Sequence, residues 1–342
     1  MIATDSKEKN TNSKDLSMGF IGVGWIGRNR MEVMLQNPNL QAAAIAEPFN
    51  ENAEAARKVA PDTNITKSPE EIYENEEIDA VVIATPSAMH AEQSIKALNS
   101  GKAVFCQKPL GRTAAEVREV INASARNNKL LGVDMSYRYT KAFKAVYEVV
   151  KRGNLGKIYA VDLVFHNAYG PDKDWFFDIK RSGGGSVMDL GIHLIDLALW
   201  SLDFPGIREV NSKLYHKGKK LKSFEEEVED FAQVSMISED DTSINLQCSW
   251  HVSAGRDAVI EAKFYGTEGG AAFKNVDGSF YDFVAEKYSG TQTEVLVSPP
   301  DDWSGRAGLV WVKNLLKDDT YDEQSAEEFL KTSEIIDRIY GR

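Results

Sequence analysis

The chain is poor in cysteine: only Cys106 and Cys248 occur in 342 residues, far apart and without Cys-x-x-Cys spacing. A disulfide framework or a zinc knuckle is therefore not expected, which fits a reducing compartment. No apolar run approaches the ~18 residues that would span a bilayer. Basic residues are a minority, because 40 Lys and Arg stand against 52 Asp and Glu, giving a formal charge of −12. This balance argues against nucleic acid or an anionic membrane as a partner, so we expect a soluble, cytoplasmic protein.

The length is sufficient for two packed domains, since single cores rarely grow beyond ~250–300 residues. Residues 1–17 are polar and lack the apolar segment of a secretion signal, so we expect a disordered tail. Residues 18–150 alternate short apolar runs with helical patterns, which predicts a Rossmann domain with a doubly wound parallel sheet. Its strands are expected at 18–21, 40–46, 64–66, 79–84, 103–106 and 130–133.

Residues 151–342 carry several alternating segments and few helices. This pattern predicts an α+β domain whose mostly antiparallel sheet has one face covered and the other available for association. Its strands are expected at 158–165, 231–237, 243–250, 259–265 and 280–285. Helices are expected over 187–202 and over 325–340, the latter packing on either domain. The acidic run 225–230 is expected to be a solvated loop or the beginning of a strand.

The most informative segment is residues 18–27, where an apolar strand leads directly into a Gly-x-Gly-x-x-Gly turn. Gly22 allows the tight turn, and Gly24 lacks the Cβ that would keep a pyrophosphate away. Gly27 lets the next helix pack close to the strand, and the N-terminus of that helix offers N–H groups and a positive dipole to phosphates. The expected cofactor-binding residues of this turn are Gly22, Val23, Gly24, Trp25, Ile26 and Gly27.

Glu47 completes this dinucleotide signature, twenty residues beyond Gly27 and at the end of the second apolar run. A carboxylate there accepts hydrogen bonds from the ribose hydroxyls. It would repel a 2′-phosphate, and residues 48–50 offer no cation, so NAD is favoured over NADP. Arg28 and Arg30 lie on the first helix and are within conceivable reach of that phosphate, so this is a preference only.

Four further polar segments are candidates for the site. Ligands of doubly wound sheets bind beyond the carboxyl ends of the strands. Segments 85–90, 107–109 and 136–138 follow the fourth, fifth and sixth strands, and segment 182–193 comes from the second domain. The fold therefore predicts that these segments supply the polar groups around the nicotinamide.

Asp189 and His193 are four apart on an expected helix, so both project from one face. Such a pair is often purely structural. In the same way, Lys108 is equally consistent with a solvated surface lysine, and His90 with a passive residue of a first helical turn. The functional interpretation rests on their combination, because Lys108 is expected at the nicotinamide end of the cofactor cleft.

Taken in order, the motifs resemble those of the glucose–fructose oxidoreductase/inositol dehydrogenase (Gfo/Idh/MocA) family over nearly the whole chain after residue 17. The motifs are the N-terminal fingerprint, Thr85-Pro86 with His90, Lys108-Pro109, and Gly183-Gly184-Gly185 leading to Asp189-x-x-x-His193. The resemblance implies a Rossmann domain followed by a domain with an open, predominantly antiparallel sheet. It also implies a homodimer or homotetramer formed through that sheet.

The resemblance also implies roles for individual residues. Lys108 matches the family lysine that contacts the reacting hydroxyl, and it counts as both a catalytic and a substrate-binding candidate. Asp189 and His193 match the helical pair, whose histidine is usually taken as the acid/base. The residues that match positions near the cofactor are Thr85, Pro86, His90, Gln107, Lys108 and Arg138.

One departure from the family pattern is Gln107, which stands where the family has glutamate before the lysine. Glutamine still hydrogen-bonds to a ribose hydroxyl, but it brings no charge to hold the neighbouring lysine. The change indicates either a subfamily with different proton handling or weakened catalysis, and we favour the former because the other site positions are intact.

The expected chemistry is hydride transfer between a nicotinamide and a secondary alcohol of a sugar, sugar derivative or cyclitol. His193 is the expected general base, Asp189 its orienting carboxylate and Lys108 the donor to the substrate oxygen. The substrate loop is expected at 167–181, where aromatic and polar groups suit a sugar; an ordinary loop pinned by its aromatics is the alternative. Its candidate substrate contacts are Asn167, Tyr169 and Trp175, and segment 302–306 is a further candidate.

Three rival functions remain open from the sequence. The first is an enzyme that keeps NAD bound and recycles it, oxidising a sugar only transiently, as an oxidoreductase or in an oxidation-assisted cleavage of a glycoside. The second is a non-catalytic regulator that senses NAD or a sugar. The glutamine at position 107, in place of the family glutamate, is the reason to consider it. The third is a metal enzyme built on His166, Asp189 and His193, although their spacing does not demand a metal and none is expected.

Overall fold

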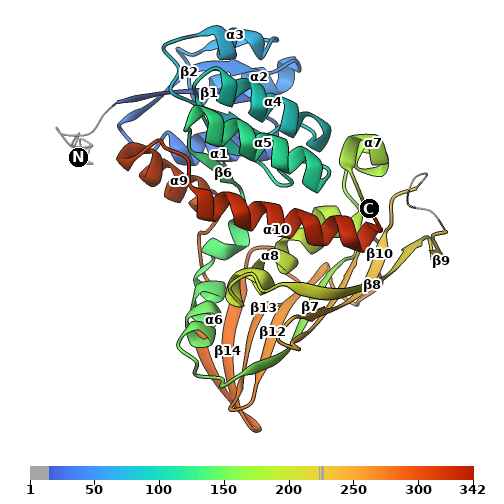
Figure 1. The fold of residues 1–342 in the computed structure, drawn as a ribbon. Helices are drawn as coiled ribbons and strands as arrows, with labels where there is room; N and C mark the ends of the chain where they lie inside the picture. Colours follow the sequence, from blue (N-terminus) through green and yellow to red (C-terminus); the bar gives the residue numbers. More distant parts are fainter. Residues whose placement is uncertain (1–14, 223, 225–226) are drawn as a thin grey trace. The chain divides into compact units, whose positions relative to one another are not determined.

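The computed structural model describes residues 15–222, 224 and 227–342. Most of the expected N-terminal tail, residues 1–14, lies outside them. The chain divides into two compact units (Figure 1). Unit 1 comprises residues up to Leu110 together with Arg118–Asp134 and Ser304–Ala326. Unit 2 comprises Gly111–Val117, Met135–Trp303 and Glu327–Arg342. Residues 135–150, assigned above to the first domain, therefore belong to unit 2.

Unit 1 contains a six-stranded parallel sheet in the order β3-β2-β1-β4-β5-β6. Its strands are β1 (Leu16–Ile21), β2 (Leu40–Ala46), β3 (Asn64–Thr66), β4 (Ala80–Ile83), β5 (Ala103–Cys106) and β6 (Leu131–Val133). This is the Rossmann order, and the expectation of a doubly wound parallel sheet is confirmed. β4 and β5 are buried throughout because parallel sheets are covered on both faces.

The helices of unit 1 follow from this strand order. The crossovers from β1 to β2 and from β4 to β5 leave the middle of the sheet in opposite directions. Because such crossovers are right-handed, α1 and α4 lie on opposite faces of the sheet. The helices are α1 (Trp25–Met34), α2 (Asn50–Arg57), α3 (Glu70–Glu74), α4 (Ser87–Asn99), the greater part of α5 (Ala114–Asn127) and α9 (Arg306–Lys317).

α9 is an element that the sequence analysis did not predict. Its Trp311 ring lies 5.5 Å from the ring of Phe105 on β5. A Cβ on Gly132 would come within 2.4 Å of the same indole, so β6 admits α9 only where it carries a glycine. A helix from the far end of the chain therefore completes the core of unit 1.

Unit 2 contains a nine-stranded sheet in the order β15-β14-β13-β12-β7-β11-β10-β8-β9. The described strand pairs are antiparallel except that of β7 with β11, so the expected mostly antiparallel sheet is confirmed. The strands are β7 (Ile158–Asn167), β8 (Ile207–His216), β9 (Lys219–Lys220), β10 (Phe231–Ser238), β11 (Ser243–Ser249), β12 (Ala258–Gly266), β13 (Gly270–Asn275), β14 (Phe283–Ser289) and β15 (Gln292–Val297).

Helices cover one face of this sheet. The helical elements of unit 2 are η1 (Ser136–Tyr139), α6 (Lys141–Lys151), η2 (Asp174–Phe177), α7 (Ile179–Ser182), a π-helical turn (Val187–Gly191), α8 (Ile192–Ser201) and most of α10 (Glu323–Tyr340). Phe143 of α6 packs on Phe264 and Phe273 of the sheet. Along β10, Ala232 and Val234 are buried and Gln233 between them is exposed, which is the alternation of a strand with one covered face.

Three expectations need correction. β1 begins at Leu16, so residues 16–17 belong to a strand and not to the tail. The expected helix from residue 187 opens with a π-helical turn before α8. In the acidic run, residues 225–226 lie outside the described residues, but Glu229 is fully buried and therefore not part of a solvated loop. No helix in the described part of the chain is long and apolar enough to cross a membrane.

Candidate active site

The glycine turn of unit 1 has the geometry that its sequence predicted. Gly22 has a φ of 81°, and a Cβ there would come within 2.7 Å of the Ala84 carbonyl oxygen. A Cβ on Gly27 would lie 2.2 Å from the Gly22 oxygen. At Gly24 an added Cβ would meet none of the described atoms within 4 Å. Two glycines are thus required by the fold, whereas the third faces open space.

The N-terminus of α1 is suited to an anion. Its N-cap residue is Gly24, which has no side chain that could cap the helix. The first turn of α1 contains no acidic residue. The first N–H groups of a helix lack partners within the helix and carry the positive end of its dipole. A pyrophosphate at this turn would satisfy them, so the residues present fit a dinucleotide.

Glu47 lies beside the same turn. Its Oε2 accepts a hydrogen bond from the Val23 N–H at 2.9 Å, and its Oε1 accepts one from the Phe49 N–H at 3.0 Å. The residue is only 4 % exposed, so these bonds fix the carboxylate at the end of β2. Trp25 and Phe49 flank the turn and are 66 % and 69 % exposed, which makes them candidates for contacts with flat rings.

His90 ties together the segments that follow β4 and β5. Its Nδ1 lies 2.6 Å from the Pro109 carbonyl oxygen, and its Nε2 lies 2.7 Å from that of Thr85. Burial lowers the pKa of His90 and thereby favours the neutral ring. The hydrogen bonds with the two carbonyl oxygens have the opposite effect and raise the pKa, but burial is the larger cause. Thr85 itself donates a hydrogen bond from Oγ1 to Gln93 at 2.6 Å. These contacts make His90 a brace between the two segments expected to line the cofactor.

Gln107 is explained by its surroundings. Its side-chain amide donates a hydrogen bond to Oδ2 of Asp134, which also accepts one from Arg30 Nε at 2.6 Å. All three side chains are buried. A second carboxylate at position 107 would meet Asp134 as a like charge, so a neutral amide fits there. Asp134 thus brings a negative charge to the end of β5, and Arg30, which was considered for a 2′-phosphate, is bound to it.

Arg138, expected near the cofactor, has other partners in unit 2. Its guanidinium makes a bidentate pair with Asp196, at 2.7 and 2.6 Å, and its third nitrogen reaches Glu328 at 2.6 Å. It also stacks over the Trp200 ring at 5.1 Å. Because all three guanidinium nitrogens bind carboxylates, these contacts favour a structural role.

The π-helical turn and α8 carry the acidic residue and the histidine. Asp189 Oδ2 accepts a hydrogen bond from the Trp250 indole N–H at 3.1 Å. The His193 ring packs against Tyr137 at 4.8 Å with an interplanar angle of 61°, and His193 is 7 % exposed. The pKa of Tyr137 is raised by burial and by the charge of Asp189. Tyr137, Asp189 and His193 therefore form one cluster, and π-helical turns are frequent at functional sites.

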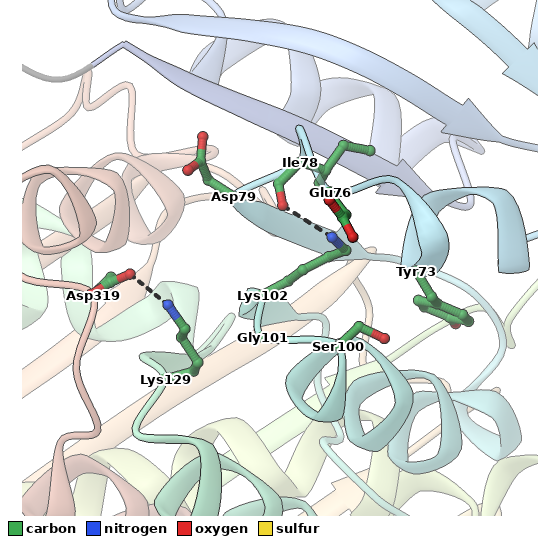
Figure 2. Close-up of a pocket in the computed structure, with 9 residues that line it drawn as sticks. All are labelled: Tyr73, Glu76, Ile78, Asp79, Ser100, Gly101, Lys102, Lys129 and Asp319. Carbon is green, nitrogen blue, oxygen red and sulfur yellow. Dashed lines mark hydrogen bonds and ion pairs between the residues drawn. The ribbon is translucent and has the colours of Figure 1, made fainter.

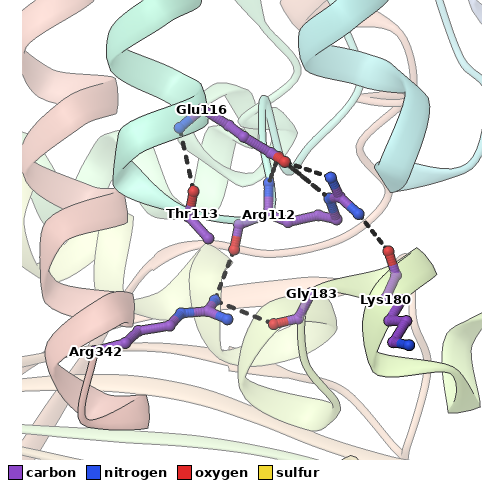
Figure 3. Close-up of polar contacts among 6 residues, drawn as sticks. All are labelled: Arg112, Thr113, Glu116, Lys180, Gly183 and Arg342. Carbon is purple, nitrogen blue, oxygen red and sulfur yellow. Dashed lines mark hydrogen bonds and ion pairs between the residues drawn. The ribbon is translucent and has the colours of Figure 1, made fainter. Parts of the chain in front are cut away.

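The glycine segment before this helix is held tightly. Figure 3 shows Arg112 bound to Glu116 and to the backbone of Lys180, while Arg342 donates hydrogen bonds to the carbonyl oxygens of Arg112 and Gly183 at 2.6 and 3.1 Å. Gly183 has a φ of 80°, and a Cβ on it would meet the Arg112 side chain at 2.6 Å. These contacts fix the end of α7.

The candidate substrate loop is only partly connected to this helix. Trp175 stacks on Phe176 at 3.8 Å, and Phe176 and Phe177 meet the edge of Trp250, whose indole binds Asp189. The other two candidates have structural partners. Tyr169 donates its hydroxyl proton to Asp257 at 2.7 Å, and the Asn167 side chain accepts from the Tyr169 N–H at 2.8 Å.

Trp250 also borders a cavity of about 590 Å³ in unit 2. Its lining includes Tyr215, Phe231, Asp230 and His251. Trp250 and Phe231 were expected only as strand residues, whereas Tyr137 lies in segment 136–138, which was expected to supply polar groups to the site. The contact between the Tyr137 and His193 rings follows no local sequence pattern, because the two residues are 56 positions apart.

Another cavity, of about 300 Å³, lies in unit 1 and is shown in Figure 2. It lies at the residues that precede β4 and β5, which is the edge of the sheet opposite the glycine turn. Lys102 donates hydrogen bonds to the carbonyl oxygens of Asn75 and Ile78 at 2.7 and 3.1 Å, and Lys129 pairs with Asp319 at 2.8 Å. Its cations are thus bound to the protein's own oxygens.

The metal alternative gains no support. Among the residues that the structure describes, no group of three or more His, Cys, Asp or Glu side chains is placed to hold a metal ion. His166 instead lies with Nδ1 2.8 Å from the Ser249 hydroxyl and stacks on Phe231. Burial lowers the pKa of His166.

The fold and these two sets of residues define a class. A parallel sheet with an open glycine turn and a buried carboxylate after its second strand is typical of dinucleotide-binding domains, and the second unit adds a buried histidine and an aspartate on one helical segment. A protein with both is a dinucleotide-dependent oxidoreductase of two-domain architecture.

Comparison with known protein families supports this class of protein. Residues 16–135 match the oxidoreductase family with an NAD-binding Rossmann fold (GFO_IDH_MocA), and residues 143–272 match a GFO/IDH/MocA C-terminal domain. The chain belongs to the Gfo/Idh/MocA oxidoreductase family, and the resemblance found in the sequence is confirmed.

Curated relatives include dehydrogenases of sugars and cyclitols. The chain is 25% identical to the D-glucoside 3-dehydrogenase of Escherichia coli (strain K12), over 76% of this chain and 77% of that protein. It is 30% identical to the inositol 2-dehydrogenase of Rhizobium meliloti (strain 1021), over 54% of each.

Solved structures share the fold. GenD2 from gentamicin A biosynthesis, in complex with NAD, matches with a TM-score of 0.80 and 22% identity, over 100% of this chain and 98% of that one. Levoglucosan dehydrogenase, in complex with NADH and levoglucosan, matches with a TM-score of 0.80 and 22% identity, over 95% and 96%.

Proposed function

We propose that this protein is an NAD-dependent dehydrogenase that oxidises a secondary alcohol of a sugar, sugar derivative or cyclitol. The observation that carries the proposal is the pair of features in the two units: the open glycine turn with Glu47, and the helix with Asp189 and His193. Relatives that act on glucosides and inositol support the substrate class.

NAD is the proposed cofactor rather than NADP. Glu47 would repel a 2′-phosphate, and Arg30 is bound to Asp134. When bound, NAD supplies the hydride acceptor. The proposed contacts of unit 1 are Gly22, Val23, Gly24, Trp25, Ile26, Gly27, Glu47, Thr85, Pro86, Gln107 and Lys108, with His90 bracing the segments after β4 and β5.

The chain's own residues would move the proton. His193 acts as general base toward the alcohol, since imidazole ordinarily titrates close to neutral pH. Lys108 donates a hydrogen bond to the same oxygen and stabilises its developing negative charge. Asp189, held by Trp250, stabilises the imidazolium that forms. The Tyr137 ring, packed on His193, limits the orientations of the imidazole.

The substrate would be held by Lys108, Asp189 and His193, together with Trp175. Flat apolar rings suit the faces of a sugar, and the polar groups suit its hydroxyls. Tyr169 and Asn167 remain candidates, although their described partners favour a role in holding the loop. We further propose a cytoplasmic homo-oligomer formed through the uncovered face of the large sheet.

The test is a substrate screen of the full chain with NAD, in which NADH formation is followed by its absorbance across polyols, inositols and glycosides. We expect NADH to form with at least one of them. Firm NAD binding without NADH formation from any of them would contradict the proposal and favour the sensor. A nucleotide that copurifies and turns over without release would favour the enzyme that recycles NAD.

A further inference from the structure

Glu229 is a buried ionisable residue that the proposed mechanism does not use. It lies two residues before the first residue of β10, and its side chain is 0 % exposed. Its Oε2 accepts a hydrogen bond from the Gly185 N–H at 3.0 Å, and its Oε1 accepts one from the Val187 N–H at 2.8 Å. Its backbone carbonyl oxygen accepts from the Ser186 N–H at 3.0 Å. One residue thus binds three consecutive N–H groups where the helix with Asp189 and His193 begins.

Tyr340 of α10 completes this arrangement. Its hydroxyl donates to Glu229 Oε1 at 3.0 Å and accepts from the Met188 N–H at 3.2 Å. The N–H groups of 185–188 would otherwise have no partner inside the helix, because a helix leaves its first N–H groups unpaired. An anion there also interacts favourably with the helix dipole. Glu229 and Tyr340 are therefore the N-terminal cap of this helix, supplied from two distant parts of the chain.

The glycines of the segment leave room for this cap. A Cβ on Gly185 would lie 1.9 Å from the Glu229 carbonyl oxygen, and a Cβ on Gly184 would lie 2.2 Å from the Tyr340 hydroxyl. Both approaches are too close for any side chain other than hydrogen. The close approach of Glu229 and Tyr340 thus explains Gly184 and Gly185, whereas Gly183 is required by its φ of 80° and by Arg112.

We propose that Glu229 is a positioning residue, which sets the start of the catalytic helix and so the placement of Asp189 and His193. This inference rests on the proposed function. The residue touches neither substrate nor cofactor in this scheme, and it acts through the backbone of 185–188. Removal of its oxygens would leave at least two buried N–H groups without acceptors, and the turn would shift to reach new ones.

The surroundings of Glu229 give it a titration that can be followed. Burial raises its pKa to about 7, although its hydrogen bonds from Val187, Gly185 and Tyr340 lower it. The ionisable groups that face it are the Tyr340 phenol and, from β11, the Cys248 thiol. Both pKa values are raised, first by burial and then by the charge of Glu229, with Asp189 adding to the effect on Cys248.

The experiment compares Glu229→Gln, Tyr340→Phe and the control Glu286→Gln in the full chain. Glu286 is also a hydrogen-bonded carboxylate of unit 2, paired with Lys274 and Tyr288 on the sheet. Two measurements are made: amide hydrogen exchange of residues 185–188, and kcat with KM and NAD affinity for a substrate found in the screen. Tyr340→Phe keeps the two Glu229 backbone bonds, so it tests the proposal even if Glu229→Gln fails to fold.

We expect faster exchange at 185–188 in Glu229→Gln, a smaller increase confined to Met188 and its neighbours in Tyr340→Phe, and none in the control. We also expect kcat to fall by ~10²-fold in Glu229→Gln, since a displacement of about 1 Å has an effect of this size, with KM and NAD affinity within about twofold. Unchanged exchange at 185–188, or an unchanged kcat, overturns the proposal. If the wild-type protein oxidises no polyol, the proposed function fails while the exchange measurement still decides whether Glu229 caps the helix.

Discussion

The two glycine-rich segments of this chain solve the same physical problem in opposite ways. Each leads into a helix whose first N–H groups need acceptors. At the first segment the N-cap residue of α1 is Gly24, which has no side chain to cap the helix, and an added Cβ would meet open space. At Gly185 the acceptor is built in, because Glu229 binds the N–H groups and its backbone lies 1.9 Å from where a Cβ would be. The first segment is open to a ligand, and the second is filled by the protein.

The difference shows what a glycine motif alone can indicate. A segment that is open and preceded by a strand points to a phosphate, whereas a filled one points to a helix held in a fixed position. The open segment belongs to the proposed cofactor side and the filled one to the proposed chemical side. Substitutions on the two sides should therefore separate binding from turnover.

The largest expected effect is that of His193→Ala. We expect kcat to fall by ~10²–10⁴-fold, the usual contribution of a general base, while NAD affinity stays within about twofold. Steady-state kinetics with calorimetric NAD binding would check this. Unchanged turnover would remove His193 from the mechanism and reduce the filled segment to a structural feature.

Gly185→Ala tests the filled segment directly. The new methyl group would collide with the Glu229 carbonyl oxygen, which is backbone and cannot move aside cheaply. We expect the free energy of unfolding to fall by about 3 kcal/mol, at the upper end for overpacking. Denaturant unfolding measures it, and a loss below about 0.5 kcal/mol would show that the segment is looser than described.

Glu229 should also show itself in the pH dependence of stability. Its pKa is about 7 in the folded protein and 4.5 as its ordinary value, so the folded state binds the proton more tightly. The contribution is present below pH 4.5 and is lost as the pH rises through 7. The free energy of unfolding of wild type minus that of Glu229→Gln should therefore fall by up to about 3 kcal/mol over this range. A difference that rises or stays flat with pH would contradict the burial of this carboxyl.

Gly24→Ala is the matched substitution in the open segment. Because the methyl group would enter open space, we expect the stability to change by less than about 0.5 kcal/mol. NAD affinity should fall about tenfold or more, since the methyl group occupies the approach of the pyrophosphate. Equal NAD affinity in wild type and variant would mean that the open segment does not hold the phosphates.

Much of unit 1 was predictable because its requirements are local. The expected strands at 40–46, 64–66 and 103–106 have the same bounds in the structure, since each is a short run between clear helical or turn segments of the sequence. The glycine turn was predictable because its motif is local: Gly22 adopts a φ of 81°, and a Cβ on Gly27 would lie 2.2 Å from the Gly22 oxygen.

The remaining features depend on partners far apart in the sequence. Glu229 lies in an acidic run that suggested solvent, yet its partner Tyr340 is 111 residues away. Trp311 fills a space that the glycine at position 132 leaves on β6. Arg138 matched a cofactor-side motif, but Asp196 and Glu328, which bind it, belong to elements that no local pattern connects with it.

The central claim is that Lys108 and His193 act on the same alcohol group, and a double-mutant cycle tests it most directly. The measurement is kcat/KM for wild type, Lys108→Ala, His193→Ala and the double variant with one polyol. Groups that serve one transition state are strongly non-additive. We therefore predict a double variant only slightly slower than the slower single variant. Losses that multiply independently would contradict a shared site.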